Sequence, residues 1–276
     1  MLLSPLVAVA LLAQSIAVTG GTSAVSERTR FRFENPSTFS GPDLVPHFFV
    51  QEYDVPPIAF WAQATYGRAD GSARTRVAIT PRRQTRASDI DTFRLASGDT
   101  ATSGTDGPVT LGGFAITQTM SIRPLGGWRL DTLLTYRRDR TEFLPDDRIV
   151  THTQPPSITR TFITDRETTI AQVFGVGMVA ERARVAGAWR SSVTLSVQPV
   201  AAARLMVRLP DKYPGVDLHF AALSFGGGAS WTIERRSDHW SAGITIGGSA
   251  MHGYRSSADY RAHRIGIDVF VGTGGR

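Results

Sequence analysis

Alternation of apolar and polar residues, repeated in segment after segment, is the feature that most constrains the fold of this chain. In residues 128–137, Trp128, Leu130, Leu134 and Tyr136 fall on one side of an extended backbone, opposite mainly polar residues. A period of two is typical of β-strands with one apolar face, and a helical period is almost absent after residue 25. The same alternation is found in 184–198, 240–249 and 264–271. The sequence therefore predicts an all-β protein.

Short and long connections alternate between the predicted strands. Tight turns are expected at Asp70-Gly71 and at residues 124–127, 181–184 and 236–239. Longer polar segments lie between them, at about 35–57, 86–108, 144–164, 199–216 and 252–259. This order is expected when strands cross a membrane up and down, with short turns on one side and extended loops on the other. The count is about ten strands, and the first is either 28–34 or Leu44–Tyr53.

The absence of hydrogen-bonding partners in hydrocarbon requires such a sheet to close on itself. Ten residues of a tilted strand rise about 25 Å, which matches the apolar band of outer-membrane barrels. Trp128 and Trp240 directly follow tight turns, where an aromatic belt is expected. We therefore predict a closed, antiparallel, up-and-down transmembrane β-barrel. The alternative is a soluble ligand-binding β-barrel or sandwich, in which the same apolar faces point inward.

The N-terminal segment has the pattern of a secretory leader. Residues 1–17 contain an apolar core from Leu6 to Ala13, followed by small residues. Cleavage is expected after Ala17 or after Ala24, so residues 1–24 are interpreted as a signal peptide and residues 25–276 as the barrel domain. The alternative is a buried N-terminal helix. No later segment reaches the roughly 20 apolar residues of a membrane-spanning helix. Export places the barrel in the outer membrane of a Gram-negative envelope.

The basic residues are almost all arginine. The formal net charge is +6, and Lys212 is the only lysine among 30 basic residues. Because the arginines are scattered and no nucleic-acid-binding motif accompanies them, nucleic acid is not expected as a partner. Arginine suits phosphate groups. The candidates for contact with lipopolysaccharide phosphates near the predicted outer rim are Arg82, Arg83, Arg137 and Arg138.

Other arginines fall on the polar side of the alternating strands and are predicted to face the lumen. These are Arg129, Arg184, Arg190 and Arg264. Asp131 and Asp268 are expected as their partners, because they share that side. The lumen of a ten-stranded barrel is narrow, so such side chains would fill it.

No residue pattern indicates a cofactor or a metal site. The chain has no cysteine, and its six histidines are dispersed without ligand spacing. The run Gly226-Gly227-Gly228 lies within a predicted strand and indicates close packing or a bend. The expected partners are outer-membrane lipid, lipopolysaccharide and the barrel-assembly machinery. The chain departs from the usual terminal aromatic residue of such barrels, because Phe270 is followed by six further residues.

Two short pairs give the chain a resemblance to the omptins, which are outer-membrane proteases with ten-stranded barrels. Asp89-Ile90-Asp91 lies in the second predicted long loop, and Asp217-Leu218-His219 ends the fourth. The resemblance implies that Asp217 orients His219, which activates a water that Asp89 and Asp91 help to place. Asp217 and His219, however, share the side of the apolar residues in 217–233, which would aim them outside the barrel. The alternative is that all four are ordinary loop and interface residues.

The sequence thus predicts an outer-membrane barrel with a structural, surface-interaction or weak pore-forming role. An omptin-like endoprotease is the alternative from the enzyme class.

Overall fold

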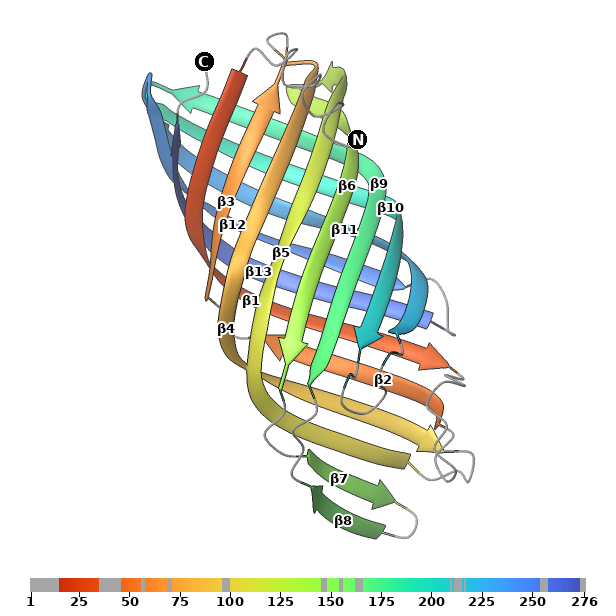
Figure 1. Ribbon diagram of the computed structural model, residues 1–276. Helices are drawn as coiled ribbons and strands as arrows, with labels where there is room; N and C mark the ends of the chain where they lie inside the picture. Colours follow the sequence, from red (N-terminus) through yellow and green to blue (C-terminus); the bar gives the residue numbers. More distant parts are fainter. Residues whose placement is uncertain are drawn as a thin grey trace.

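The fold is a single antiparallel sheet that closes into a barrel, as the ribbon of the computed structural model shows (Figure 1). The structure describes residues 15–34, 46–55, 58–68, 71–95, 100–144, 148–153, 156–161, 166–208, 210, 215, 217–253 and 258–273. The strands are β1 (Ser15–Glu34), β2 (Pro46–Val55), β3 (Ile58–Gly67), β4 (Ala73–Leu95), β5 (Thr100–Leu125), β6 (Trp128–Phe143), β7 (Arg148–Thr153), β8 (Pro156–Thr161), β9 (Glu167–Ala186), β10 (Trp189–Arg208), β11 (Asp217–Arg236), β12 (Trp240–Gly253) and β13 (Ala258–Thr273). Within the described residues, no helix is long and apolar enough to cross a membrane.

The barrel has ten strand positions around its circumference, although thirteen strands are distinguished along the chain. β2 and β3 together occupy one of these positions, because both pair with β1 at different heights. The sequence between them is Pro56-Pro57, and proline lacks the N–H that a strand ladder needs. β7 and β8 form a hairpin at the lower end of Figure 1, and β7 pairs with β5 of the barrel.

Closure is made by β1 and β13, which pair without interruption from Thr19↔Gly272 to Phe33↔Ala258. The predicted closed, up-and-down barrel of about ten strands is therefore confirmed. The first strand contains the predicted 28–34 but begins earlier, at Ser15. The described part of the alternative first strand, Leu44–Tyr53, belongs to β2, which occupies the second strand position.

Three of the four predicted tight turns are found, and one prediction is wrong. Residues 181–184 lie inside β9, and the turn is formed instead by Gly187 and Ala188, with Gly187 at a φ of 59°. The apolar alternation of the sequence runs through this turn, so 184–198 has the pattern of one strand, although the paired Ala186 and Trp189 share a face and the turn therefore exchanges the odd-numbered and even-numbered faces. Trp189 therefore directly follows a tight turn and begins its strand, as Trp128 and Trp240 do.

Two predicted long loops are largely strand. Residues 86–108 belong mostly to β4 and β5, which pair as far as Arg94↔Thr100. In 199–216, β10 continues to Arg208, opposite the start of β11 at Asp217. Residues 86–108 are mainly polar on both faces, whereas residues 200–207 carry apolar side chains on both faces, and alternation reveals a strand only where one face alone is apolar. The wall therefore extends well past the height that ten residues would span.

The outer surface of the barrel carries apolar side chains. Val193 is 38% exposed and Ile267 is 46% exposed, although both are large aliphatic residues within long strands. Ile244, Leu195 and Val269 are exposed in the same way. This is the arrangement of a barrel that faces lipid, and it is opposite to the inward apolar face of a soluble barrel.

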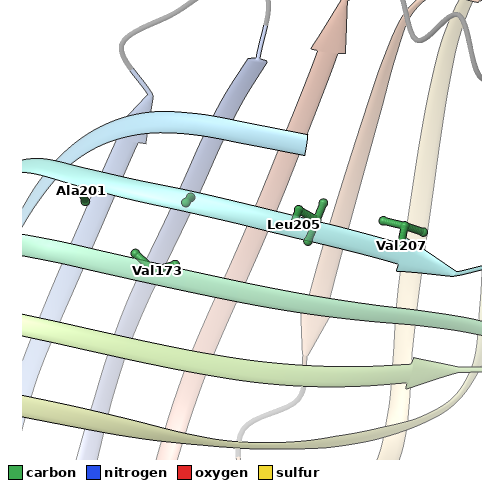
Figure 2. Packing of buried hydrophobic residues seen from close by; sticks show 5 residues of the cluster. Val173, Ala201, Leu205 and Val207 are labelled. Atoms are coloured by element: carbon green, nitrogen blue, oxygen red, sulfur yellow. The ribbon is translucent and has the colours of Figure 1, made fainter. Parts of the chain in front are cut away.

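A bulge in β10 exchanges the outer and inner faces of that strand. The register of β10 shifts between Val197 and Ala201 against both neighbours. Before the shift, odd-numbered residues such as Val197 lie outside; after it, odd-numbered residues such as Leu205 are buried in the barrel. These residues form an apolar cluster (Figure 2), which consists of Val173, Ala201, Ala203, Leu205 and Val207. A bulge in β4, between Thr80 and Arg83, exchanges the outer and inner faces of that strand in the same way.

The glycine run in β11 is explained by close strand packing, as predicted. A Cβ atom on Gly226 would lie 2.5 Å from the carbonyl oxygen of Ala250, and one on Gly227 would lie 2.6 Å from that of Ser196. Any side chain here would push the neighbouring strands apart.

Candidate functional site

The structure places Asp217 and His219 on the outside of the barrel wall. Both lie at the start of β11, both are exposed, and they share the side of Leu223 and Phe225, which are 40% and 43% exposed. β11 pairs in unbroken register with β10 from Asp217 to Ser224 and with β12 from Ser224 to Arg236. The direction expected from counting residues along the strand is therefore the direction found.

The carboxylate of Asp217 is bound by Arg208 on the neighbouring strand. Arg208 Nε lies 2.6 Å from Oδ1 and Arg208 Nη2 lies 2.7 Å from Oδ2, which makes a two-point contact. These hydrogen bonds hold the pKa of Asp217 below its usual value, and the nearby His219 lowers it further. Both oxygens that could orient a histidine are thus engaged by a guanidinium.

Asp89 and Asp91 lie on a distant wall, in a strand and not in the loop that was expected. Their backbones are on β4, where Asp89 pairs with Thr105 and Asp91 with Ser103 of β5. Their side chains lie outside the described part of the structure. β4 and β11 are five strand-to-strand steps apart in either direction around the barrel. Since Asp217 and His219 face away from the lumen between these walls, the structure does not bring the two pairs together.

An aromatic group marks the outer surface above the middle of the barrel. The rings of Phe114 and Tyr136 are 5.8 Å apart, and Tyr136 pairs with Phe174, which is 49% exposed. Gln172 Nε2 donates a hydrogen bond of 3.1 Å to Tyr136 Oη. Tyr136 stands about 20 Å above Trp128, from the rise of a tilted strand. The two heights match the two aromatic girdles of an outer-membrane barrel.

Basic residues lie directly above this aromatic group. Arg138 and Arg140 are exposed on β6, two and four residues beyond Tyr136. Glu142 joins two of the cations: Arg82 Nη2 and Arg140 Nη2 each lie 2.6 Å from one of its carboxylate oxygens. We call Arg82, Arg138 and Arg140 the basic belt.

Only half of the predicted lipopolysaccharide contacts lie on this outer face. Arg82 and Arg138 do, whereas Arg137 takes the opposite side of β6, where its Nε lies 2.5 Å from Asp139 Oδ2. Arg83 follows Arg82 directly, and its Nε atom is buried. Adjacent residues of a strand point to opposite faces, so a pair of consecutive arginines cannot both face lipid.

Charged side chains line the lumen near the tight turns. Arg129 Nε lies 2.8 Å from Asp131 Oδ1. Arg190 is bound by Glu181 and by Glu234, the latter at 3.0 Å. The lumenal positions predicted for Arg129 and Arg190, and the partner predicted for Arg129, are therefore found.

Two of the predicted lumenal residues differ in detail. Arg184 pairs with Ser191, whose hydroxyl accepts a hydrogen bond from the outward-facing Trp231, so Arg184 takes the outer face. This error follows from the misplaced turn. The side-chain partner found for Asp268 is Ser23, and not an arginine.

Sequence analysis missed several members of the lumenal charge group. They are Arg74, Arg76, Glu181, Glu234 and Arg236. Counting alternate residues through 73–80 would have found Arg74 and Arg76, since Ile79 on the other side of β4 is 53% exposed. Among the described residues, no group of three acidic or histidine side chains could hold a metal ion.

Comparison with known proteins identifies the fold and nothing finer. No family model matches the chain. No curated protein matches it either. The outer membrane protease OmpT from Escherichia coli superimposes with a TM-score of 0.64 at 8% identity, covering 95% of this chain and 97% of OmpT. Two further structures also match, each at 8% identity: the translocator domain of autotransporter NalP from Neisseria meningitidis, with a TM-score of 0.36, and Ail of Yersinia pestis, with 0.31. The chain thus has the outer-membrane β-barrel fold with omptin-like, ten-stranded topology.

Proposed function

We propose that the protein is an outer-membrane barrel that acts through its outer surface, where the basic belt binds the phosphate groups of lipopolysaccharide. The observation that supports this proposal is the position of Arg82, Arg138 and Arg140 immediately above the aromatic group around Tyr136. That height is the headgroup level of a bilayer whose apolar band begins at the Trp128 end. An outward apolar surface below and an outward basic surface above match a lipid that is apolar at one end and phosphorylated at the other.

The chemistry of the belt favours an anionic headgroup. Glu142 neutralises one charge of three arginines and holds two of the guanidiniums in place. The remaining N–H groups of Arg82 and Arg140 are free to turn to a phosphate, and guanidinium binds phosphate at two points. No ion pair engages Arg138 within the described residues. The belt therefore presents preorganised donors with a positive excess.

The test is the amount of lipopolysaccharide that stays bound during purification from outer membranes. The triple variant Arg82→Gln, Arg138→Gln, Arg140→Gln is expected to retain several-fold less, measured as lipid phosphate per protein. Arg137→Gln is the matched control, because it removes a neighbouring arginine that points into the barrel. Equal retention by the triple variant and the wild type would remove the proposal.

An omptin-like endoprotease is the second candidate, supported by the overlap with the OmpT fold over nearly the whole chain. Its proposed residues are Asp89, Asp91, Asp217 and His219. The outward direction of His219 and the engagement of Asp217 by Arg208 weigh against a shared site. Refolded protein with lipopolysaccharide should leave a dibasic peptide intact. Cleavage that is lost in an Asp217→Ala, His219→Ala variant would establish the protease instead.

Location and processing belong to the same proposal. We infer that an N-terminal leader exports the chain, and that the barrel-assembly machinery inserts it into the outer membrane. Heat-modifiable gel mobility and partition into detergent are expected. A protein that stays dissolved without detergent would instead be a soluble ligand-binding barrel.

A further inference from the structure

We infer that the lumen near the tight turns contains a binding site for a small oxyanion, formed by Arg74 and Arg76 of β4. The two residues are separated by one position on the strand, so their side chains take the same face. The opposite face carries Ile79, which is exposed on the outer surface. The two guanidiniums therefore point into the barrel.

Electrostatic interactions across the lumen support this direction. Arg74 interacts with charges on β6, β9 and β10, which are two to four strands away around the wall. Those charges belong to Arg129, Asp131, Glu181 and Arg190. Interactions over that number of strands pass through the interior, because the wall itself separates the groups by too great a path.

The charges that interact with Arg74 and Arg76 do not balance, and the further lumenal carboxylate, Asp268 of β13, is hydrogen-bonded to Ser23 of β1. The carboxylates of Asp131, Glu181 and Glu234 are engaged by Arg129, Arg190 and Arg236. Each of the three carboxylates thus has an arginine of its own to pair with. Arg74 and Arg76 are left as two further cations, and within the described residues neither guanidinium has an ion pair or a hydrogen bond.

Two uncompensated cations side by side in an enclosed space need an anion or water. Arg76 is enclosed by the barrel wall, yet its surface stays accessible from the lumen. The hydroxyl residue Thr117 of β5 is paired with Arg76, and Thr65 of β3 lies on the other side of Arg76. The hydroxyl of Thr119, which is paired with Arg74, donates to the Arg74 carbonyl oxygen and is not counted among the donors. A phosphate, sulfate or carboxylate group matches this set of donors.

A further donor without a partner lies higher on the neighbouring wall. The indole Nε1 of Trp61 is buried, and no hydrogen-bond acceptor reaches it within the described part of the chain. A buried N–H without a partner is costly, and an acceptor-rich ligand or water in the lumen would satisfy it. The unmet hydrogen-bonding capacity on this side of the lumen thus favours acceptors.

The probe is inorganic phosphate, titrated calorimetrically into the purified barrel in a non-ionic detergent, with sulfate and acetate in separate titrations. Saturable binding to the wild type is expected, and Arg74→Gln, Arg76→Gln should weaken it roughly tenfold or more. If acetate binds as tightly as phosphate, the ligand is a carboxylate. If phosphate and sulfate bind more tightly than acetate, the ligand is a tetrahedral oxyanion.

Two controls make the result decisive. Arg184→Gln removes an arginine at the same end of the barrel but on the outer face, and it should bind phosphate like the wild type. Arg74→Lys, Arg76→Lys keeps the charges and should retain most of the binding. Heat-modifiable mobility checks folding, which is expected to survive because removing Arg74 relieves its repulsion with Arg129. Absence of binding to the wild type, or equal binding by the folded glutamine variant, would overturn the inference.

Discussion

Arg208 and Asp217 face each other across β10 and β11 and share two hydrogen bonds, of 2.6 Å and 2.7 Å, on the outer face of the wall. The contact joins the last residue of one strand to the first residue of the next. It therefore fixes the end of the hairpin at the point where the paired wall stops.

Replacing Arg208 with Gln should raise the pKa of Asp217 toward the ordinary value for aspartate. The folded-state pKa is lowered mainly by the Arg208 hydrogen bonds, so the ion pair is complete above the unfolded value and is lost as the pH falls through the folded one. Carbon NMR of labelled aspartate carboxyls would follow the titration. Arg204→Gln, on the same face of the same strand, is the control; an unchanged Asp217 titration in Arg208→Gln would contradict the assignment.

Replacing Val193 with Arg should destabilise the inserted barrel by about 2–4 kcal/mol, which is the cost of a cation at the bilayer midplane. The reason is that Val193 faces outward in the middle of the apolar surface. Reversible urea unfolding in lipid vesicles measures the change. Val271→Arg is the matched variant, because Val271 also faces outward but lies near the tight turns, where the cost is about 0–1 kcal/mol. Equal costs at the two sites would contradict the proposed depth.

Replacing Gly177 with Ala should disturb the β10 bulge. A Cβ atom there would lie 1.9 Å from the carbonyl oxygen of Val197, so the strands must move apart, and overpacking of this kind costs about 1–3 kcal/mol. The same unfolding experiment should show a lower midpoint. Gly104→Ala is the comparison, since a Cβ atom at Gly104 meets nothing within 4 Å. If both variants unfold alike, the close contact at Gly177 is not present in solution.

The site of leader cleavage should be Ala17 and not Ala24. Residues Thr19–Ala24 pair with β3 on one side and with β13 on the other, so cleavage after Ala24 would remove part of the strand that closes the barrel. Mass spectrometry of the mature protein would give its first residue. A chain that starts at Val25 is expected to fail the heat-modifiability test, and a mature N-terminus at Val25 in a folded barrel would show that closure does not need these residues.

The parts of the fold that depend on periodicity could be predicted from sequence, and those that depend on a single inserted residue could not. The apolar side of 264–271 correctly places Ile267 on the outside. The bulges after Thr80 and Val197 leave no mark in the alternation, because each adds one residue to one strand only. The turn at Gly187 is hidden for a related reason, because the apolar–polar alternation of the sequence continues through it although one strand ends and the next begins there.

The candidate sites show the same division. The outward direction of His219 is predictable because β11 pairs regularly with β10 from Asp217 to Ser224 and with β12 from Ser224 to Arg236. Arg137 and Arg138 are adjacent in the sequence near the predicted outer rim, but neighbouring positions of a strand point to opposite sides, so the two arginines do not form one basic surface. The contacts that define the lumenal group, such as Arg190 with Glu181 and Glu234, join residues from three strands. Which partner each cation takes depends on stagger between strands, and a single sequence does not specify that stagger.

The extra residue in β10 has a consequence for how the envelope boundary is encoded. From Trp189 to Val207 most odd-numbered residues of β10 are apolar, yet those before the bulge face the outside of the barrel and those after it face the protein's own interior. A hydropathy plot therefore does not reveal the position at which the apolar face of β10 turns from the outside to the inside. Moving the inserted residue by two positions along the strand would raise or lower the upper boundary of the outward apolar surface while leaving the composition of the chain unchanged.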